Sequence, residues 1–118
     1  HASAVENLTQ ELRRGSLVLV VLLESGEPRY GYSLVERLQA RGVTVEQNTL
    51  YPLLRRLERQ GCLESSWDTS ASRPRKYYRI SEDGTTVAAL LLEEWRHLTS
   101  TIEEIAADSA VKINKEQR

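Results

Sequence analysis

The chain has 118 residues, of which 40% are hydrophobic and 28% are charged, a composition typical of one small globular domain. A single cysteine, Cys62, excludes an intramolecular disulfide and a cysteine-based zinc site; with only two histidines, we predict no metal site and no cofactor. The sequence offers no serine–histidine–aspartate set, no paired carboxylates in a pocket context and no glycine-rich phosphate loop, so we do not expect an enzyme. The longest apolar run, Leu17–Leu23, is too short to span a bilayer, which favours a cytoplasmic protein with no membrane partner.

The net charge of −1 conceals an uneven distribution along the chain. Residues 49–79 carry seven basic and three acidic side chains, whereas residues 80–118 carry four basic and eight acidic ones. The basic charge therefore lies in the middle third, where a footprint for a polyanion would need it. The alternative is an ordinary solvated surface, which charge alone does not distinguish from a binding site.

Two helices are predicted in the first third of the chain. Leucines at helical spacing favour a first helix from about Leu8 to Glu24, and the run Leu17–Leu23 is apolar all round, which predicts that neighbouring elements enclose it. A second helix is expected over about Gly31–Ala40, with Gly42 at the position where a left-handed cap is common.

A third helix is predicted to begin at Asn48 or Thr49, whose side-chain oxygens can cap its free N–H groups, and to end at Gly61. Pro52 is then expected in or near the first turn, where its missing N–H costs least. Apolar residues recur on one face of this helix, namely Leu50, Leu53, Leu54 and Leu57. Two helices joined by a tight link, the second with a polar start, form a helix-turn-helix pattern.

A strand, a polar loop and a return strand are predicted next. Over residues 63–68, Leu63, Ser65 and Trp67 alternate with polar residues, which indicates a half-buried strand. The loop spans residues 69–74. On the return strand we place Tyr78 in the core, whereas for Tyr77 core and surface positions stay equally open.

The last predicted element is a long helix over residues 81–108, capped by Ser81 and followed by a polar tail at residues 109–118. At about 25 residues it would be on the order of 40 Å long, too long for the preceding unit to cover. Its apolar residues alternate steps of three and four, as in a coiled-coil seam: Ala88, Leu91, Trp95, Leu98, Ile102 and Ile105. We therefore favour a dimer seam over the alternative, a helix folded back on its own core.

Three segments together form a distinctive combination, in this order and at this spacing: Tyr30–Leu34 (YGYSL), Thr49–Glu58 (TLYPLLRRLE) and Arg73–Ser81 (RPRKYYRIS), with Gly61 and Gly84. They resemble the PadR family of bacterial transcriptional regulators over roughly residues 12–105. The resemblance implies a mainly α protein with a small β-hairpin (α+β), in which residues 8–80 form a winged helix-turn-helix and residues 81–108 dimerise. It also implies that the protein represses transcription, as members of the family usually do.

If the third helix enters the major groove by its N-terminal half, its exposed face supplies the contacts to bases. The planar fork of Arg55 suits a guanine, Thr49 or Pro52 suits a thymine methyl group, and Arg56 is placed for a phosphate. The hairpin is expected to contact the flanking backbone or minor groove. The predicted DNA contacts are Tyr32, Asn48, Thr49, Tyr51, Pro52, Arg55, Arg56, Arg73, Arg75 and Lys76.

Trp95 lies near the middle of the predicted seam. It resembles the position at which some PadR-family members keep a tryptophan that lines a pore for flat aromatic ligands, so Leu91 and Trp95 are the candidate effector site. The alternative is plain seam packing. The predicted dimer interface comprises Leu12, Leu19, Leu91, Trp95, Leu98, Ile102 and Ile105.

The leading hypothesis is a homodimeric repressor that binds a palindromic operator in double-stranded DNA and is released by a small aromatic effector. Two alternatives stay open: a winged-helix module that binds a protein partner, and a dimer that binds aromatic ligands but no DNA. Four basic residues among the seven from Arg73 to Arg79 favour DNA, because a protein-docking hairpin has no need of them.

Overall fold

The computed structural model describes residues 2–70, 72–111 and 113, and among them four helices and three strands follow in chain order. The elements are α1 (Ala2–Glu24), β1 (Arg29–Tyr30), α2 (Gly31–Ala40), α3 (Gln47–Arg59), β2 (Leu63–Asp68), β3 (Arg75–Ile80) and α4 (Glu82–Asp108). The strands form one antiparallel sheet in the order β1–β3–β2. The predicted mainly helical fold with a small hairpin is confirmed, and β1 adds a third strand that was not predicted.

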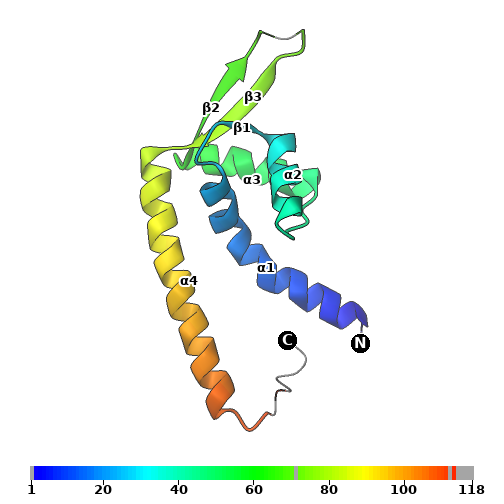
Figure 1. The fold of residues 1–118 in the computed structure, drawn as a ribbon, viewed down its shortest axis with the longest axis vertical. Helices are drawn as coiled ribbons and strands as arrows, with labels where there is room; N and C mark the ends of the chain where they lie inside the picture. The colour runs from blue at the N-terminus through cyan, green and yellow to red at the C-terminus, as the bar shows by residue number, and fades with distance from the viewer. Residues whose placement is uncertain (1, 71, 112, 114–118) are drawn as a thin grey trace.

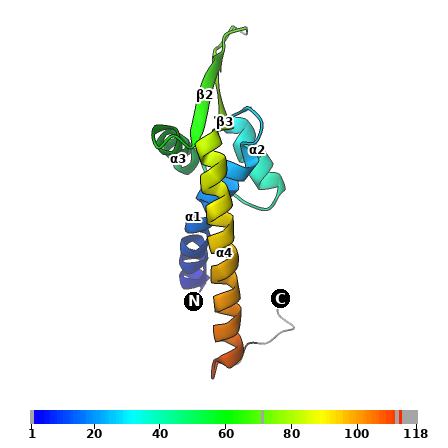
Figure 2. The ribbon, with the colours of Figure 1, turned by 90° about the vertical axis from the view of Figure 1, so that its left-hand side faces the viewer.

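The molecule is elongated, measuring 59 × 32 × 21 Å along its principal axes. Figure 1 shows the β2–β3 hairpin projecting at one end, while α4 and the N-terminal half of α1 extend toward the other end. In the view turned by 90°, α2 and α3 lie on either side of the base of the hairpin (Figure 2). The helix-turn-helix and the hairpin are therefore neighbours, and two long helices lead away from them.

The core lies where the second half of α1 meets α2 and α3. Each helix contributes fully buried side chains, among them Leu22 from α1, Leu34 and Leu38 from α2, and Leu50 and Leu54 from α3. Burial of each such leucine contributes about 1.5–3 kcal/mol relative to exposure. These contacts fix the rotation of α3, so that its opposite, polar face points to solvent.

Helix α1 ends at Glu24, as predicted, but it begins earlier than predicted. It begins at Ala2 and not at Leu8, because the preceding residues continue the helix as an exposed extension. The expectation that Leu17–Leu23 is enclosed on all sides is wrong at Leu23, which is exposed, because α2 and α4 cover only part of the circumference of α1. Helix α2, in contrast, has the predicted bounds, and Gly42 follows it with a φ of 86°.

Helix α3 begins earlier than predicted. Its N-cap is Glu46, whose backbone carbonyl accepts hydrogen bonds from the N–H groups of Thr49 and Leu50 at 3.0 and 2.9 Å. Asn48 and Thr49 are therefore helical residues and not caps. Pro52 consequently lies in the second turn, where it removes the N–H that would bond the Asn48 carbonyl. The helix tolerates this because both residues are exposed, so water can satisfy the freed carbonyl.

The hairpin formed by residues 63–80, called the wing below, pairs along its full length, from Leu63 opposite Ile80 to Asp68 opposite Arg75. Its base is buried at Leu63 and at Tyr78, as predicted. Trp67, expected to be half-buried, is 62% exposed, because the hairpin extends beyond the core at this level. Strand β1 pairs with β3 on the other side, which places Tyr30 opposite Tyr77.

The start of α4 is joined tightly to the turn between α3 and β2. Ser81 caps α4, as predicted: its Oγ accepts from the Gly84 N–H at 2.8 Å and donates to the Gly61 carbonyl at 2.6 Å. A Cβ on Gly84 would stand 2.0 Å from the Cys62 carbonyl oxygen, so only glycine permits this approach. The helix ends at Asp108; of the expected polar tail, residues 109–111 and 113 lie outside the helix, and the others lie outside the described residues.

Candidate nucleic-acid interface

The exposed face of α3 carries most of the residues of this helix that are predicted to contact DNA. They are called the reading face below and comprise Asn48, Thr49, Pro52, Arg55 and Arg56, all of them exposed. They share α3 with the buried leucines, whose packing fixes which way this face points. The helix therefore presents a polar, arginine-bearing surface on a rigid support.

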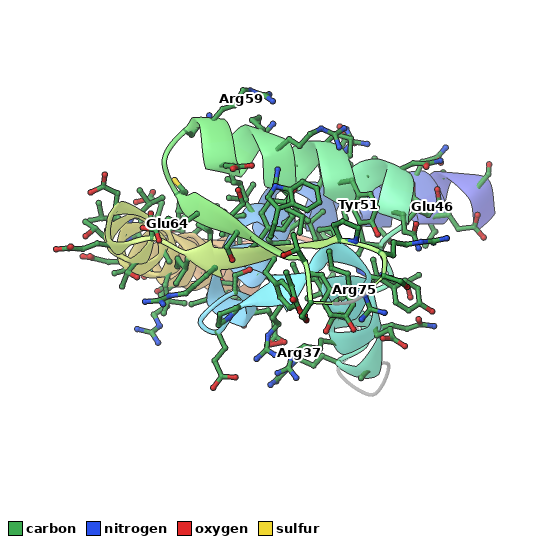
Figure 3. The ribbon with its side chains drawn as sticks, turned by 90° about the horizontal axis from the view of Figure 1, so that it is seen from above. Arg37, Glu46, Tyr51, Arg59, Glu64 and Arg75 are labelled. Carbon is green, nitrogen blue, oxygen red and sulfur yellow. The ribbon has the colours of Figure 1, made fainter. Side chains whose placement is uncertain are left out.

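Tyr51 differs from its neighbours on α3. It is half-buried, and its ring lies against the backbone of Gly31 at the start of α2, where any added Cβ would meet the ring at 2.4 Å. Figure 3 shows Tyr51 between α3 and α2, whereas Arg59 points outward. Tyr51 thus belongs to the contact that sets the angle of the helix-turn-helix. Tyr32, the predicted contact on α2, is exposed in the first turn of that helix.

The predicted basic residues of the wing occupy three different environments. Arg73 is exposed in the loop at its tip. Arg75 is also exposed, but it donates a hydrogen bond from Nη1 to the Tyr30 hydroxyl at 3.2 Å, and its guanidinium lies 5.0 Å from the centre of that ring. Tyr30 in turn meets Tyr77 edge to face, with the ring centres 5.2 Å apart. The outer face of the wing therefore holds Arg75 in a defined place.

Lys76 is engaged on the opposite face of the wing. Its Nζ lies 3.0 Å from Oε1 of Glu58 on α3, and it stands 5.1 Å from the centre of the Tyr78 ring. The other carboxylate oxygen of Glu58 accepts a hydrogen bond from Ser65 on β2. The bonds from Ser65 and Lys76 hold the pKa of Glu58 below its usual value, and the bond to Glu58 raises the pKa of Lys76.

Glu58 is not among the predicted site residues, although the sequence contains a signal for it. Glu58 stands four residues after Leu54 and eight after Leu50, so it continues the buried side of α3 toward the wing. A charged residue at such a position predicts a partner on the element packed there. Trp67 is also placed differently from its prediction: it was expected to be half-buried, but it is exposed.

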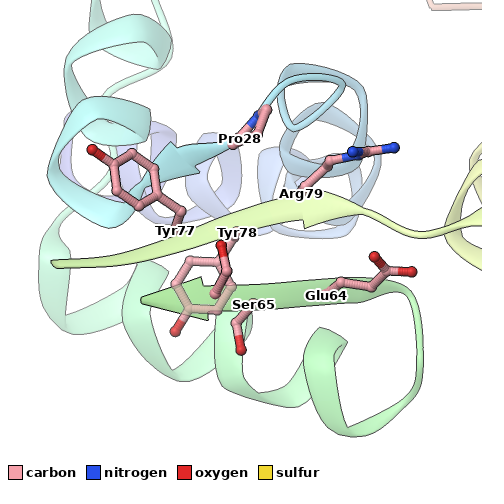
Figure 4. Close-up of a pocket in the computed structure, with 7 residues that line it drawn as sticks. Pro28, Glu64, Ser65, Tyr77, Tyr78 and Arg79 are labelled. Atoms are coloured by element: carbon pink, nitrogen blue, oxygen red, sulfur yellow. The ribbon is translucent and has the colours of Figure 1, made fainter. Parts of the chain in front are cut away.

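A small open hollow lies at the base of the wing, on the side of β1 (Figure 4). Its lining includes Pro28, Glu64, Ser66, Tyr77 and Arg79. The candidate effector residues, Leu91 and Trp95, do not line it. The hollow therefore does not correspond to the predicted effector site.

Helix α4 exposes a row of apolar side chains beyond its junction with the core. Ala88 is buried and Leu91 is half-buried, because the first turns of α4 pack on the core of the same chain. The row called the apolar stripe below is about half exposed: Trp95 49%, Leu98 55%, Ile102 49% and Ile105 63%.

The predicted interface residues of α1 are placed differently from one another. Leu12 is 77% exposed, whereas Leu19 is buried in the core of the same chain, so little of the Leu19 side chain is accessible for the predicted interface. Val5 and Leu8, which the prediction did not include, are exposed on the same extension of α1. Apolar surface is thus offered by both long helices, at the end away from the wing (Figure 1).

Within residues 2–70, 72–111 and 113, no cluster of three or more histidine, cysteine, aspartate or glutamate residues is placed to hold a metal ion. Nor does any helix in that part combine the length and the apolarity needed to cross a membrane.

A helix-turn-helix with a polar reading face, flanked by a small antiparallel sheet whose hairpin projects basic residues, defines a winged helix-turn-helix. This confirms the predicted fold. The chain belongs to the PadR-like family of transcriptional regulators, which it matches over residues 18–90. The protein is therefore a DNA-binding transcriptional regulator, and its family consists of regulators and not of enzymes.

Individual relatives support the same assignment. The crystal structure of a PadR family transcriptional regulator from Eggerthella lenta superposes with a TM-score of 0.88 at 44% identity, covering 92% of this chain and 96% of that one. A PadR-like transcription factor from Bacteroides fragilis gives 0.72 at 32% identity, covering 85% and 99%. A transcriptional regulator from Mycobacterium tuberculosis is 32% identical over 97 residues, which are 81% of this chain and 88% of that one.

Proposed function

We propose that this regulator is a homodimeric repressor that binds a palindromic operator and is released by a small aromatic effector. The observation that carries the proposal is the apolar stripe of α4. A long amphipathic helix with no cover over its apolar face leaves that face in water at a cost of about 25 cal/mol for each Å². A second copy of the same chain covers such a face most simply, because a two-fold interface pairs the same surface on both subunits.

The geometry of the stripe fits one helix face. At about 100° per residue, its four side chains fall within an arc of roughly 80°. The N-terminal half of α1, which carries the exposed Leu12, extends toward the same end of the molecule as α4 (Figure 1), so it can pack against the partner's helices. The dimer seam therefore joins the distal halves of both long helices, away from the reading faces.

Two reading faces related by a two-fold axis match a palindromic site. Each α3 enters a major groove, and the half-sites lie about 34 Å apart, one turn of the duplex, or a small multiple of that. The exposed Arg73 at the tip of each wing then neutralises a flanking phosphate. A dimer placed on a promoter in this way blocks access to it, which is the physical basis for repression.

The effector site in this proposal lies at Leu91 and Trp95, where the stripe begins. Trp95 is half exposed in the single chain, so two copies of its indole ring face each other across the seam and leave room for a flat aromatic molecule. A molecule held there changes the packing of the seam, and with it the separation of the two reading faces.

The test has three parts. Sedimentation equilibrium at micromolar concentration is expected to return a dimer. Gel-shift titration on the DNA upstream of its own gene is expected to show binding whose log–log salt dependence has a slope of about −0.9 for each phosphate neutralised. A thermal-shift screen of aromatic compounds is expected to find ligands whose effect is absent in Trp95→Ala. A monomer that binds DNA without salt dependence would contradict the proposal.

A further inference from the structure

Three elements meet at the Glu58 carboxylate. Glu58 is near the end of α3, Ser65 is on β2, and Lys76 is on β3, opposite Trp67 in the register. Both carboxylate oxygens are used, one by the Ser65 hydroxyl and the other by the Lys76 ammonium at 3.0 Å. The two charged side chains are only 32% and 28% exposed, so water reaches them partly. The carboxylate thus ties the reading helix to both strands of the wing.

The wing is also attached on its other face, at Arg75, the residue next to Lys76 in β3. There Arg75 bonds Tyr30, which pairs with Tyr77 through β1. Farther toward the tip, the hydrogen bonds of the described side chains are local, as in the bond from Ser70 to Asp68. A hairpin held only by its backbone ladder is free to bend, so these two attachments determine how the wing stands relative to α3.

We infer that Glu58 is a positioning residue for DNA binding: its carboxylate, by holding Ser65 and Lys76, fixes the angle between the reading helix and the wing. Lys76 then serves this tie and does not neutralise a phosphate. The inference rests on the proposed docking of α3 and the wing on one duplex. If the angle between α3 and the wing is fixed before binding, less conformational entropy is lost when α3 and the wing contact DNA, and the affinity for DNA is higher.

Simple electrostatics predicts the opposite effect for a change at Glu58. Removing a negative charge beside a DNA-binding surface should strengthen binding, because phosphates are repelled less. Removing a positioning carboxylate should weaken binding, although the protein becomes more positive. The sign of the effect therefore separates the two accounts.

The first experiment measures the DNA affinity of the 118-residue chain across a range of salt concentrations. The probes are the duplex upstream of its own gene and a random duplex of equal length. Glu58→Gln is expected to weaken binding to the upstream duplex by on the order of tenfold, and Lys76→Met by a similar factor with an unchanged salt slope. The double variant should be no weaker than either single variant. The matched control, Glu64→Gln, removes an exposed carboxylate from the opposite face of β2, and it should not weaken binding.

The second experiment needs no DNA. In a Trp95→Phe background, Trp67 is the remaining tryptophan, and it lies directly opposite Lys76 in the wing. Adding Glu58→Gln to this background should lower the fluorescence anisotropy of Trp67, because the wing moves more freely. Circular dichroism of each variant checks that the helices are retained, so that unfolding is not mistaken for motion.

Tighter binding by Glu58→Gln, or a salt slope that falls by about 0.9 for each Lys76 removed, would overturn the inference and assign Lys76 to a phosphate. Unchanged Trp67 anisotropy would also overturn it. If the wild-type protein bound neither duplex, the proposed docking on DNA would be wrong. The anisotropy of Trp67 would still show whether Glu58 holds the wing in place.

Discussion

Truncating Leu98 to alanine should weaken the proposed dimer by an amount that follows from its exposure. The change removes three carbon atoms, worth about 0.8 kcal/mol each when fully buried. Since 55% of Leu98 is still exposed in the single chain, about 1.3 kcal/mol per subunit depends on the partner. A two-fold seam contains two copies, so the dimer should lose about 2.5 kcal/mol, or roughly 70-fold in its dissociation constant.

Sedimentation velocity over a dilution series measures this constant directly. The matched control is Leu90→Ala, because Leu90 is 62% exposed on the same helix but lies about 100° from the middle of the apolar stripe. We expect the control to change the dissociation constant less than about threefold. Equal effects of the two variants, or a wild-type dimer that Leu98→Ala leaves unchanged, would show that the stripe is not the seam.

Three other predictions concern the fold, the tie between α3 and the wing, and the tip of the wing. Gly84→Ala should lower the free energy of unfolding in urea by about 1–3 kcal/mol, because the new Cβ meets the Cys62 carbonyl, whereas Gly15→Ala, in open space within α1, should raise it by about 0.5–1 kcal/mol. Because the folded protein lowers the pKa of Glu58, its contribution to stability is present above about pH 4.5 and is lost as the pH falls below that; the stability gap between wild type and Glu58→Gln should close in acid urea titrations. Arg73→Ala should reduce the salt slope of DNA binding by about 0.9 per subunit; an unchanged slope would mean that the tip of the wing does not touch the backbone.

The features that the sequence predicted well depend on neighbours along the chain. The bounds of α2, the cap at Ser81 and the buried leucines of α3 follow from residues within one or two helical turns. The start of α3 was placed too late, because Glu46 caps the helix with its backbone alone and no capping side chain identifies it.

The features that were missed depend on contacts between distant segments. Strand β1 has two residues, too few for a periodic pattern, and it exists because it pairs with β3. Trp67 looks apolar enough to be buried, but its exposure is set by how far the hairpin projects. The ion pair between Lys76 and Glu58 joins residues 18 positions apart on two different elements, so no local pattern predicts it. Residue type alone suggests which side chains could contact DNA, whereas the folded arrangement determines which of those side chains already contact other parts of the protein.

The close contact between Gly84 and the Cys62 carbonyl holds one end of α4, so a small rotation at this contact produces a large displacement at the other end of the helix. Its near end is fixed to the body that carries the reading face, and its 27 residues reach about 40 Å. A rotation of about 5° at this pivot displaces the far end by roughly 3.5 Å, close to the 3.4 Å rise of one base-pair step. In the proposed dimer, a small change in packing at either end of α4 would therefore shift one reading face relative to the operator by about one base-pair step. Variants that loosen the pivot should consequently accept operators of altered half-site spacing, while each half-site is still recognised as before.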